Sequence, residues 1–349
     1  MRENLEESAE AGTPVGGVSY AEGPDGLRLP LIDIGHPAFR VALDDAALER
    51  MGEAFVEEQV RARGSWPRRL FDRFVLPRFL RRSLIGRGLL AAQGATLDGL
   101  TTYLLKLGPD HLDATWANEL DRRIAASFPG LSLRLRLQDV AELLGAALAT
   151  GLARAPDRPL WLVSLAGGAG MESLNALARL QRIAPASIAA RGVRVLILDP
   201  DLRMTDFGRT ALAAWSAPGG PLHGVRVELE RAAYDWRDPE SLDRILATIP
   251  GSALVAIASE GGLFDYADDA AVATHLRSIR ARCPPETAVC GTLNSPGRAG
   301  ALLNHGSRAA VRPRCLEEIR GLAATAGWVV VEARERPLNT AFRLERAGG

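Results

Sequence analysis

A glycine-rich stretch gives the strongest chemical signal in the sequence. Residues 162–170 read Leu-Val-Ser-Leu-Ala-Gly-Gly-Ala-Gly, an apolar run that leads directly into glycines. Glycines between a buried strand and a helix let the backbone approach a ligand closely, and a helix that begins near Met171 adds the positive end of its dipole. This order of strand, turn and helix is the one that nucleotide-type ligands need.

Carboxylates and aromatic residues follow the next two apolar runs. Asp199 ends one run, and a carboxylate there can accept hydrogen bonds from both ribose hydroxyls of an adenosine ligand. Tyr234, Asp235 and Trp236 follow the next run, where a carboxylate can accept the adenine amino proton and an aromatic ring can lie against the base. A turn cap at Asp199 and a helix cap at Asp235 are the ordinary alternatives.

The elements that carry these residues belong to an α/β fold. Apolar runs alternate with helical stretches after Pro159, which is typical of a parallel sheet covered on both faces; the runs are 161–166, 192–198, 225–229, 253–258 and 287–293. Residues 327–334 and 340–346 then form a hairpin around a short turn. We therefore predict seven strands, the last of them antiparallel to its neighbour.

The N-terminal half has a different pattern. Residues 1–26 are polar and contain Gly and Pro, so we expect a flexible arm. Residues 27–154 form a predicted helical cap with apolar residues at helical spacing. Within it, Leu131 to Leu137 alternates Leu with Ser and Arg, which fits a short strand or an extended entry into the next helix. The Arg-rich segment Arg61 to Arg87 fits an amphipathic helix better than a membrane-surface helix.

Taken together, these features resemble the class I, Rossmann-like S-adenosylmethionine-dependent methyltransferases, over roughly residues 155–346. The first motif of that family is a strand ending in acid-x-Gly-x-Gly-x-Gly. Here Ser164 stands where the family often has an acid, and Ala166 stands where its first glycine is usual. A different group is therefore expected to hold part of the methionine end of the cofactor.

A second, shorter likeness follows the fourth apolar run. Residues 259–266 read Ser-Glu-Gly-Gly-Leu-Phe-Asp-Tyr, which is similar to the Glu-Gly-Leu-x-x-Tyr segment of the leucine carboxyl methyltransferase-like branch. We hypothesise that Glu260 replaces the acid missing at Ser164. The resemblance implies S-adenosyl-L-methionine as cofactor and residues 155–349 as the catalytic domain. The implied cofactor-binding residues are Ser164, Ala166, Gly167, Gly168, Gly170, Asp199, Pro200, Tyr234, Asp235, Trp236, Ser259, Glu260 and Gly261.

The acceptor side is less defined. His305 lies in an excursion after the fifth strand, where many such enzymes build substrate contacts, and Asp265 and Tyr266 are alternative acceptor contacts. These three are the catalytic candidates, although an exposed loop histidine is the ordinary interpretation of His305. A methyltransferase with a small-molecule acceptor in specialised metabolism is the best-supported function, with oxygen as the first atom to test and nitrogen or carbon left open.

Composition narrows the remaining choices. The 349 residues carry 42 basic and 42 acidic side chains, so net charge gives no reason to expect nucleic acid. Only Lys106 is a lysine, which we attribute to genomic composition. Three scattered cysteines fit a reducing compartment, no run is long and apolar enough for a membrane helix, and no metal site is expected. The protein is therefore expected to be cytoplasmic, and a homodimer is left open.

Two rival functions remain at this level. One is an NAD(P)-dependent Rossmann oxidoreductase that uses Gly168, Gly170 and Asp199, although Ser173 stands where a full GxGxxG motif needs its third glycine. The other is a non-catalytic protein that binds S-adenosylmethionine or S-adenosylhomocysteine. The missing acid and the missing first glycine keep this second alternative open.

Overall fold

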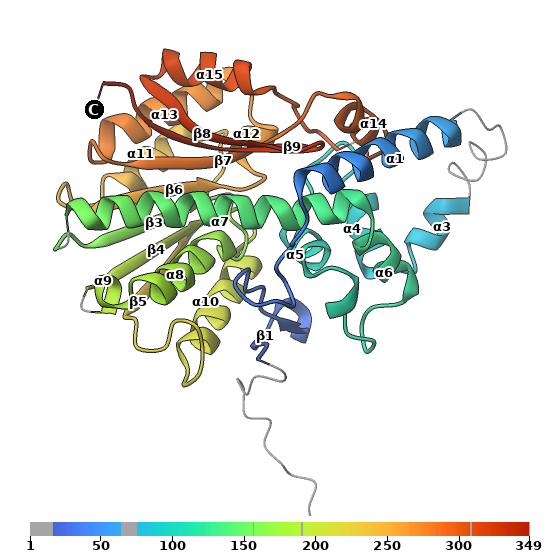
Figure 1. Cartoon of the computed structure of the whole chain (residues 1–349), viewed down its shortest axis with the longest axis horizontal. Helices are drawn as coiled ribbons and strands as arrows, with labels where there is room; N and C mark the ends of the chain where they lie inside the picture. The colour runs from blue at the N-terminus through green and yellow to red at the C-terminus, as the bar shows by residue number, and fades with distance from the viewer. Residues whose placement is uncertain (1–16, 64–74, 156, 190, 308, 349) are drawn as a thin grey trace, which may run out of the picture.

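A seven-stranded mixed sheet organises the chain (Figure 1). The structure is a computed structural model that describes residues 17–63, 75–155, 157–189, 191–307 and 309–348. The strands are β3 (Leu160–Leu165), β4 (Val193–Leu198), β5 (Val227–Ala232), β6 (Leu254–Ser259), β7 (Ala288–Asn294), β8 (Trp328–Glu335) and β9 (Asn339–Arg346). Their spatial order is β5-β4-β3-β6-β7-β9-β8, with β9 antiparallel to β7 and to β8. The predicted class I methyltransferase sheet is confirmed.

Each face of the sheet is covered by its own helices. Successive residues of a strand point to opposite faces, so Leu160 and Leu162 of β3 enter one core and Trp161 and Val163 the other. The first core includes α7 (Phe128–Arg154), α8 (Met171–Ile183) and α10 (Leu202–Ser216). The second includes α11 (Pro239–Leu246), α13 (Asp269–Arg282) and α15 (Leu316–Thr325). Because β3 and β6 are buried along their whole length, both strands are apolar except for a single serine near or at the carboxyl end, Ser164 and Ser259.

The remaining helices gather at one end of the sheet (Figure 1). They are α1 (Asp45–Arg63), α3 (Leu76–Leu80), α4 (Leu84–Ala91), α5 (Gly99–Leu107) and α6 (Glu119–Ala125), with α14 (Arg298–Ser307) beside α1. Two short helices, α9 (Pro185–Ala189) and α12 (Leu263–Tyr266), lie in connections next to the strands. A single core joins α5 to α7, α8 and α10, so this helical region shares its interior with the sheet. The Arg-rich segment 61–87 lies partly outside the described residues, and its role stays a prediction.

The described part of the expected N-terminal arm is folded, which corrects the prediction of an arm through residue 26. Strands β1 (Tyr20–Glu22) and β2 (Arg28–Pro30) pair antiparallel, and the Leu29 side chain between them is buried in the first core. The threonine hydroxyl of Thr210 on α10 donates a hydrogen bond to the Glu22 carbonyl oxygen at 2.8 Å. The polar composition of residues 1–26 indicated a flexible arm because a short hairpin buries few of its own residues. Residues 1–16 lie outside the described residues.

Both alternatives considered for Leu131 to Leu137, a short strand and an extended entry into a helix, are wrong, because these residues belong to the long helix α7. Ser127 caps the helix by accepting a hydrogen bond from the Gly130 amide, and Pro129 occupies the first turn. The alternation of Leu with polar residues imitated a strand. Because the segment is helical, the Arg136 side chain points into the interior. There it forms ion pairs with Glu260 and Asp265 instead of contacting solvent.

Helix α7 is tied to the C-terminal hairpin by a buried carboxylate. Asp139 is 1% exposed, and its oxygens accept hydrogen bonds from Arg334 and Arg336 at 3.2 Å. These two arginines belong to the end of β8 and the turn that follows it. These hydrogen bonds fix α7 across one face of the sheet. In this position α7 places Arg136 near the carboxyl ends of the strands.

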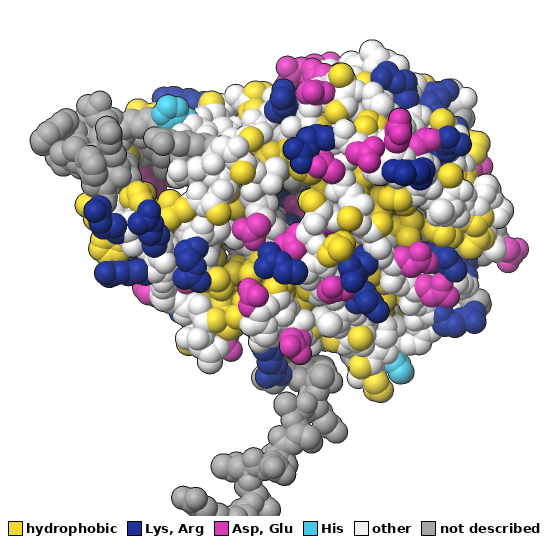
Figure 2. Space-filling view, turned by 180° about the vertical axis from the view of Figure 1, so that it is seen from behind, with side chains coloured by type: hydrophobic (Ala, Val, Ile, Leu, Met, Phe, Trp, Pro, Cys, Tyr) yellow, Lys and Arg dark blue, Asp and Glu magenta, His cyan; other side chains and the backbone are white. Residues whose placement is uncertain are grey.

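Basic and acidic side chains are interspersed over the face seen in Figure 2, in keeping with the balanced composition. Within the described residues, no helix is both long enough and apolar enough to cross a membrane.

We predict that Asp139→Asn lowers the free energy of unfolding by about 1.5–3 kcal/mol, because it removes the charge from several hydrogen bonds to arginine. Urea unfolding of the full chain measures the change. As a control, Glu119→Gln removes the partner of Arg123 in a pair whose side chains are 69% and 75% exposed, and should change the value by under about 0.5 kcal/mol. Equal losses in the two variants would contradict a special role for Asp139.

Candidate functional site

The glycine-rich loop between β3 and α8 forms one wall of a cavity of about 450 Å³. Gly168 and Gly170 have φ of +55° and +65°, values that glycine adopts without steric cost. No described atom lies within 4 Å of the position that a Gly168 side chain would start from, whereas one at Gly170 would meet Ile197 at 2.7 Å. Gly168 therefore exposes its backbone to the cavity, and Gly170 lets the loop pack on β4.

Ala166 also adopts a left-handed conformation, with φ of +50°. Its amide donates to the Leu198 carbonyl oxygen at 2.7 Å, which holds the loop against the end of β4. A residue with a Cβ is strained here by roughly 1–2 kcal/mol. The backbone at residue 166 thus has a conformation that favours glycine, and Ala166 adopts it under strain.

Asp199 lies beside this loop at the carboxyl end of β4. Its Oδ2 accepts a hydrogen bond from the Gly168 amide and its Oδ1 one from the Asp201 amide, both at 2.8 Å. Burial raises the pKa of Asp199, and the two amide hydrogen bonds oppose that rise. Each carboxylate oxygen can accept a second hydrogen bond, so Asp199 retains acceptor capacity toward the cavity.

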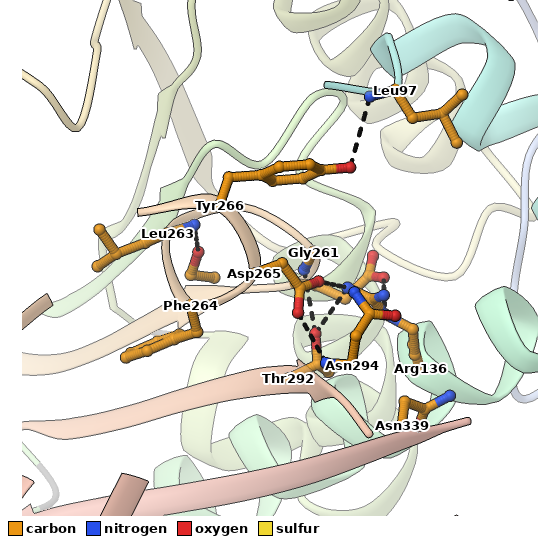
Figure 3. Close-up of polar contacts among 12 residues, drawn as sticks. Leu97, Arg136, Gly261, Leu263, Phe264, Asp265, Tyr266, Thr292, Asn294 and Asn339 are labelled. Atoms are coloured by element: carbon orange, nitrogen blue, oxygen red, sulfur yellow. Dashed lines mark hydrogen bonds and ion pairs between the residues drawn. The ribbon is translucent and has the colours of Figure 1, made fainter. Parts of the chain in front are cut away.

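A buried ionic network forms the opposite wall (Figure 3). The guanidinium of Arg136 on α7 pairs with Asp265 of α12 and donates to the Thr292 hydroxyl of β7 at 2.8 Å. Asp265 in turn accepts from the Asn294 amide at 2.9 Å, and the Gly261 amide donates to Thr292 at 3.1 Å. Burial opposes the charge of Arg136, but Asp265 and Glu260 outweigh it and raise the pKa of the guanidinium.

The only lysine of the chain joins the same network. Lys106, on the last turn of α5, contacts the Oε2 atom of Glu260, while the Arg136 Nε atom lies 3.5 Å from Oε1. The side chains of Lys106 and Glu260 are 12% and 3% exposed. Glu260 therefore links the α5 helix, the α7 helix and the loop after β6 at one point.

Glu172, in the first turn of α8, contributes a further buried carboxylate to the cavity wall. It is 2% exposed, and its Oε1 atom has no hydrogen-bond partner among the described residues. Burial raises the pKa of Glu172 to about 7, and Glu260 adds to the rise, whereas the Ser164 hydroxyl and Lys106 oppose it.

Two aromatic rings close the cavity at the side of β5. Trp236 and Tyr266 stack with centroids 6.1 Å apart and planes inclined by 14°. The Tyr266 hydroxyl accepts a hydrogen bond from the Leu97 amide at 3.4 Å, which joins α12 to the segment before α5 (Figure 3). Burial raises the pKa of Tyr266.

The structure brings most of the residues predicted from sequence to this one cavity. Those that line it are Ala166, Gly167, Gly168, Asp199, Pro200, Trp236, Glu260, Gly261, Asp265 and Tyr266. Ser164 and Ser259 are buried just behind it: Ser164 Oγ is 2.8 Å from Ser173 Oγ, and the Ser259 hydroxyl donates to the Leu165 carbonyl oxygen.

Besides these two serines, four further predicted residues do not line the cavity. Gly170 packs on β4, and Tyr234 is buried with its ring edge-on to His275. Asp235 pairs with Arg237 at the surface, and this pair lowers the pKa of Asp235. His305 is exposed on α14, because the excursion after β7 folds as a helix beside α1 instead of closing over the cavity.

Lys106, Arg136 and Glu172 line the cavity but were not identified from the sequence. Lys106 is the one lysine among 42 basic residues, and this uniqueness is the sequence signal that distinguishes it from the arginines. Arg136 lies in residues 131–137, whose alternation indicated a strand or an extended segment and so gave no reason to expect a buried helical arginine. Glu172 follows the glycine loop by two residues, but no spacing rule distinguishes it from a surface acid in a first turn.

Comparisons with known proteins support the fold. No protein-family model matches the sequence, and no curated protein matches it. The crystal structure of a possible exported protein from Bordetella parapertussis matches at 20% identity and a TM-score of 0.54, over 88% of this chain and 100% of that one. At this identity the match shows a shared fold.

Two methyltransferase structures match less extensively. Magnesium protoporphyrin IX methyltransferase from Synechocystis PCC 6803 with bound S-adenosylhomocysteine matches at 13% identity and a TM-score of 0.42, over 64% of this chain and 89% of that one. Mitomycin 7-O-methyltransferase matches at 17% identity and a TM-score of 0.41, over 66% of this chain. This chain spans 59% of the length of the mitomycin enzyme.

We predict that Ala166→Gly raises the free energy of unfolding by about 1 kcal/mol, because it removes the strain of a left-handed alanine. Ala169→Gly, in the same loop at a position without positive φ, is the matched control and should lower stability. Thermal unfolding of both variants measures the difference. A loss of stability in Ala166→Gly equal to that in the control would contradict the strain at residue 166.

We predict that Arg136→Met lowers the free energy of unfolding by about 3–5 kcal/mol, because it leaves buried carboxylates without a counter-charge. The double variant Arg136→Met/Asp265→Leu should recover part of this loss, since one of those carboxylates is then gone. Urea unfolding of the single and double variants gives both values. A double variant less stable than Arg136→Met would contradict this account of the network.

Proposed function

We propose that this chain is a methyltransferase that uses S-adenosyl-L-methionine and acts on a small-molecule acceptor. The observation that carries the proposal is the charge of the cavity at the carboxyl ends of β3, β4 and β6. Six carboxylate side chains line it against two cations, Lys106 and Arg136, and both cations are already paired. Such a site favours a ligand with net positive charge, as S-adenosylmethionine has through its sulfonium and ammonium groups.

The residues present suit the rest of that cofactor. Asp199 has acceptor capacity for the ribose hydroxyls, and the open space above Gly168 lets a ligand approach the loop. Trp236 offers an aromatic surface beside the cavity for the adenine ring. The cavity of about 450 Å³ lies in the range of small-ligand sites.

When bound, S-adenosylmethionine would supply an activated methyl group on a sulfonium. The protein's own contribution is then positioning and exclusion of water, which can supply much of the acceleration of an in-line substitution. Arg136 and Asp265 hold α7, α12 and β7 together around the site. No histidine is among the described residues that line the cavity, so a proton from an acceptor would pass to one of its carboxylates, such as Asp265, or to Tyr266.

The cap favours a small acceptor over a protein or nucleic-acid chain. Helix α5 and the segment before it supply Leu97, Thr102 and Lys106 to the cavity wall. A cavity walled on this side by helices suits a compact molecule. An oxygen acceptor from specialised metabolism, handled in the cytoplasm, is the first class to test with labelled S-adenosylmethionine.

We predict that Asp199→Asn weakens binding of S-adenosylhomocysteine by about 10- to 100-fold, because charged hydrogen bonds to the ribose are lost. Calorimetric titration measures the affinity. The control Asp206→Asn removes an exposed acid of α10 that pairs with Arg231 and should leave affinity unchanged. Unchanged affinity in Asp199→Asn would contradict the ribose role.

The same titration separates the rival functions. Wild-type binding of S-adenosylhomocysteine without binding of NAD(P) supports the methyltransferase, and the reverse result supports an oxidoreductase and overturns the proposal. Binding of S-adenosylhomocysteine with no methyl transfer to any extract in a broad panel would favour a non-catalytic binding protein.

A further inference from the structure

The chain lacks an acid at Ser164, so another carboxylate must complete the site if the proposed cofactor binds there. Two buried carboxylates stand close enough to be candidates, Glu260 and Glu172. The sequence favoured Glu260. The structure separates the two by what each already contacts.

Glu260 is committed to cations of the protein itself. Its Oε2 atom contacts the Lys106 ammonium, and its Oε1 atom faces the Arg136 guanidinium at 3.5 Å. A ligand ammonium at this position would meet two positive side chains at close range. Glu260 therefore serves to neutralise Lys106 and Arg136, and it is a poor binding group for a further cation.

Glu172 has the opposite surroundings. In both carboxylates the Oε1 atom is buried without a hydrogen-bond partner among the described residues, although a buried carboxylate oxygen ordinarily has one. The Oε1 atom of Glu260 faces the Arg136 guanidinium, whereas Glu172 forms no ion pair within the described residues. A side chain added at Gly167 would start 3.1 Å from the Glu172 Oε1 atom, so this atom lies directly against the glycine loop. Glu172 also interacts with Ser164, the residue at the position of the missing acid.

We propose that Glu172 is the carboxylate that binds the ammonium group at the amino-acid end of S-adenosylmethionine, in place of the acid absent at Ser164. This inference rests on the proposed function. The acid has moved from the end of β3 to the first turn of α8, eight residues along the chain, yet it remains beside the same serine and the same loop. Ligand binding then supplies the counter-charge and the hydrogen-bond donor that Glu172 lacks.

The electrostatic setting predicts a pH dependence for this contact. The charged and polar groups acting on Glu172 are Ser164 from β3, Glu260 after β6 and Lys106 from α5, and burial raises its pKa to about 7. The carboxyl group is therefore largely protonated at pH 6 and ionised at pH 8. An ammonium ligand binds the ionised form, so affinity should rise with pH across this interval.

The test compares two probes that differ in the amino-acid end. S-adenosylhomocysteine carries the amino-acid group, whereas 5′-methylthioadenosine keeps the adenine, ribose and thioether and lacks it. We expect Glu172→Gln to lower the affinity for S-adenosylhomocysteine by about 10- to 100-fold at pH 8. The affinity for 5′-methylthioadenosine should stay within about twofold of the wild-type value. The rise in wild-type affinity for S-adenosylhomocysteine between pH 6 and pH 8 should disappear in the variant.

The matched control is Glu240→Gln. Glu240 is an exposed acid in the first turn of α11, so its replacement removes the same charge from an equivalent helix position without touching the cavity. Both ligands should bind this variant as they bind the wild type. Weaker binding of both ligands to Glu240→Gln would show that the measured affinity depends on helix stability. This result would overturn the ammonium-binding role of Glu172.

The remaining outcomes are distinct. Unchanged affinity for S-adenosylhomocysteine in Glu172→Gln overturns the inference and leaves the proposed cofactor in place. An equal loss of affinity for both ligands in Glu172→Gln also overturns the inference, because the residue would then stabilise the conformation of the loop instead of binding the ammonium group. Failure of the wild type to bind either ligand refutes the proposed function, and the inference with it.

Discussion

The buried ion pair between Arg136 and Asp265 is the constraint on which the site depends. It joins α7, which crosses one face of the sheet, to α12 at the carboxyl ends of the strands. Such a pair costs desolvation energy and is retained only where further hydrogen bonds satisfy both partners. Thr292 and the Asn294 amide supply these bonds from β7. The pair therefore fixes the relative position of three elements, and the Lys106–Glu260 contact extends that fixed point to α5.

The departures from the family's first motif follow from the same geometry. At Ala166 the turn keeps its left-handed backbone in spite of the alanine, because the Leu198 carbonyl holds the amide in place. The buried Ser164 hydroxyl forms a hydrogen bond with the Ser173 hydroxyl. An acid at position 164 would instead need a counter-charge in the core. The carboxylate near this point instead comes from α8, whose first turn stabilises negative charge through the helix dipole.

The sheet could be predicted from the sequence because its central parallel strands β3, β4 and β6 are largely apolar, and Asp199 and Glu260 directly follow β4 and β6. The helical layer was harder to predict. Arg136 lies on a helix buried on several sides, where periodicity gives no clear face, and its Leu-Arg alternation imitates a strand. His305 and Asp235 illustrate the other limit, since sequence places a residue after a strand but does not show whether its loop turns toward the cavity or away from it.

Local charge describes the cavity better than net charge does. The chain as a whole is neutral, yet the cations of the cavity are already paired and carboxylate oxygens of Glu172 and Asp199 retain acceptor capacity. Lysine suits the position at residue 106 because a compact ammonium fits beside Glu260, whereas a guanidinium would need a wider fork of acceptors next to Arg136. Because the protein itself neutralises both cations, the remaining carboxylates give the cavity a net negative charge.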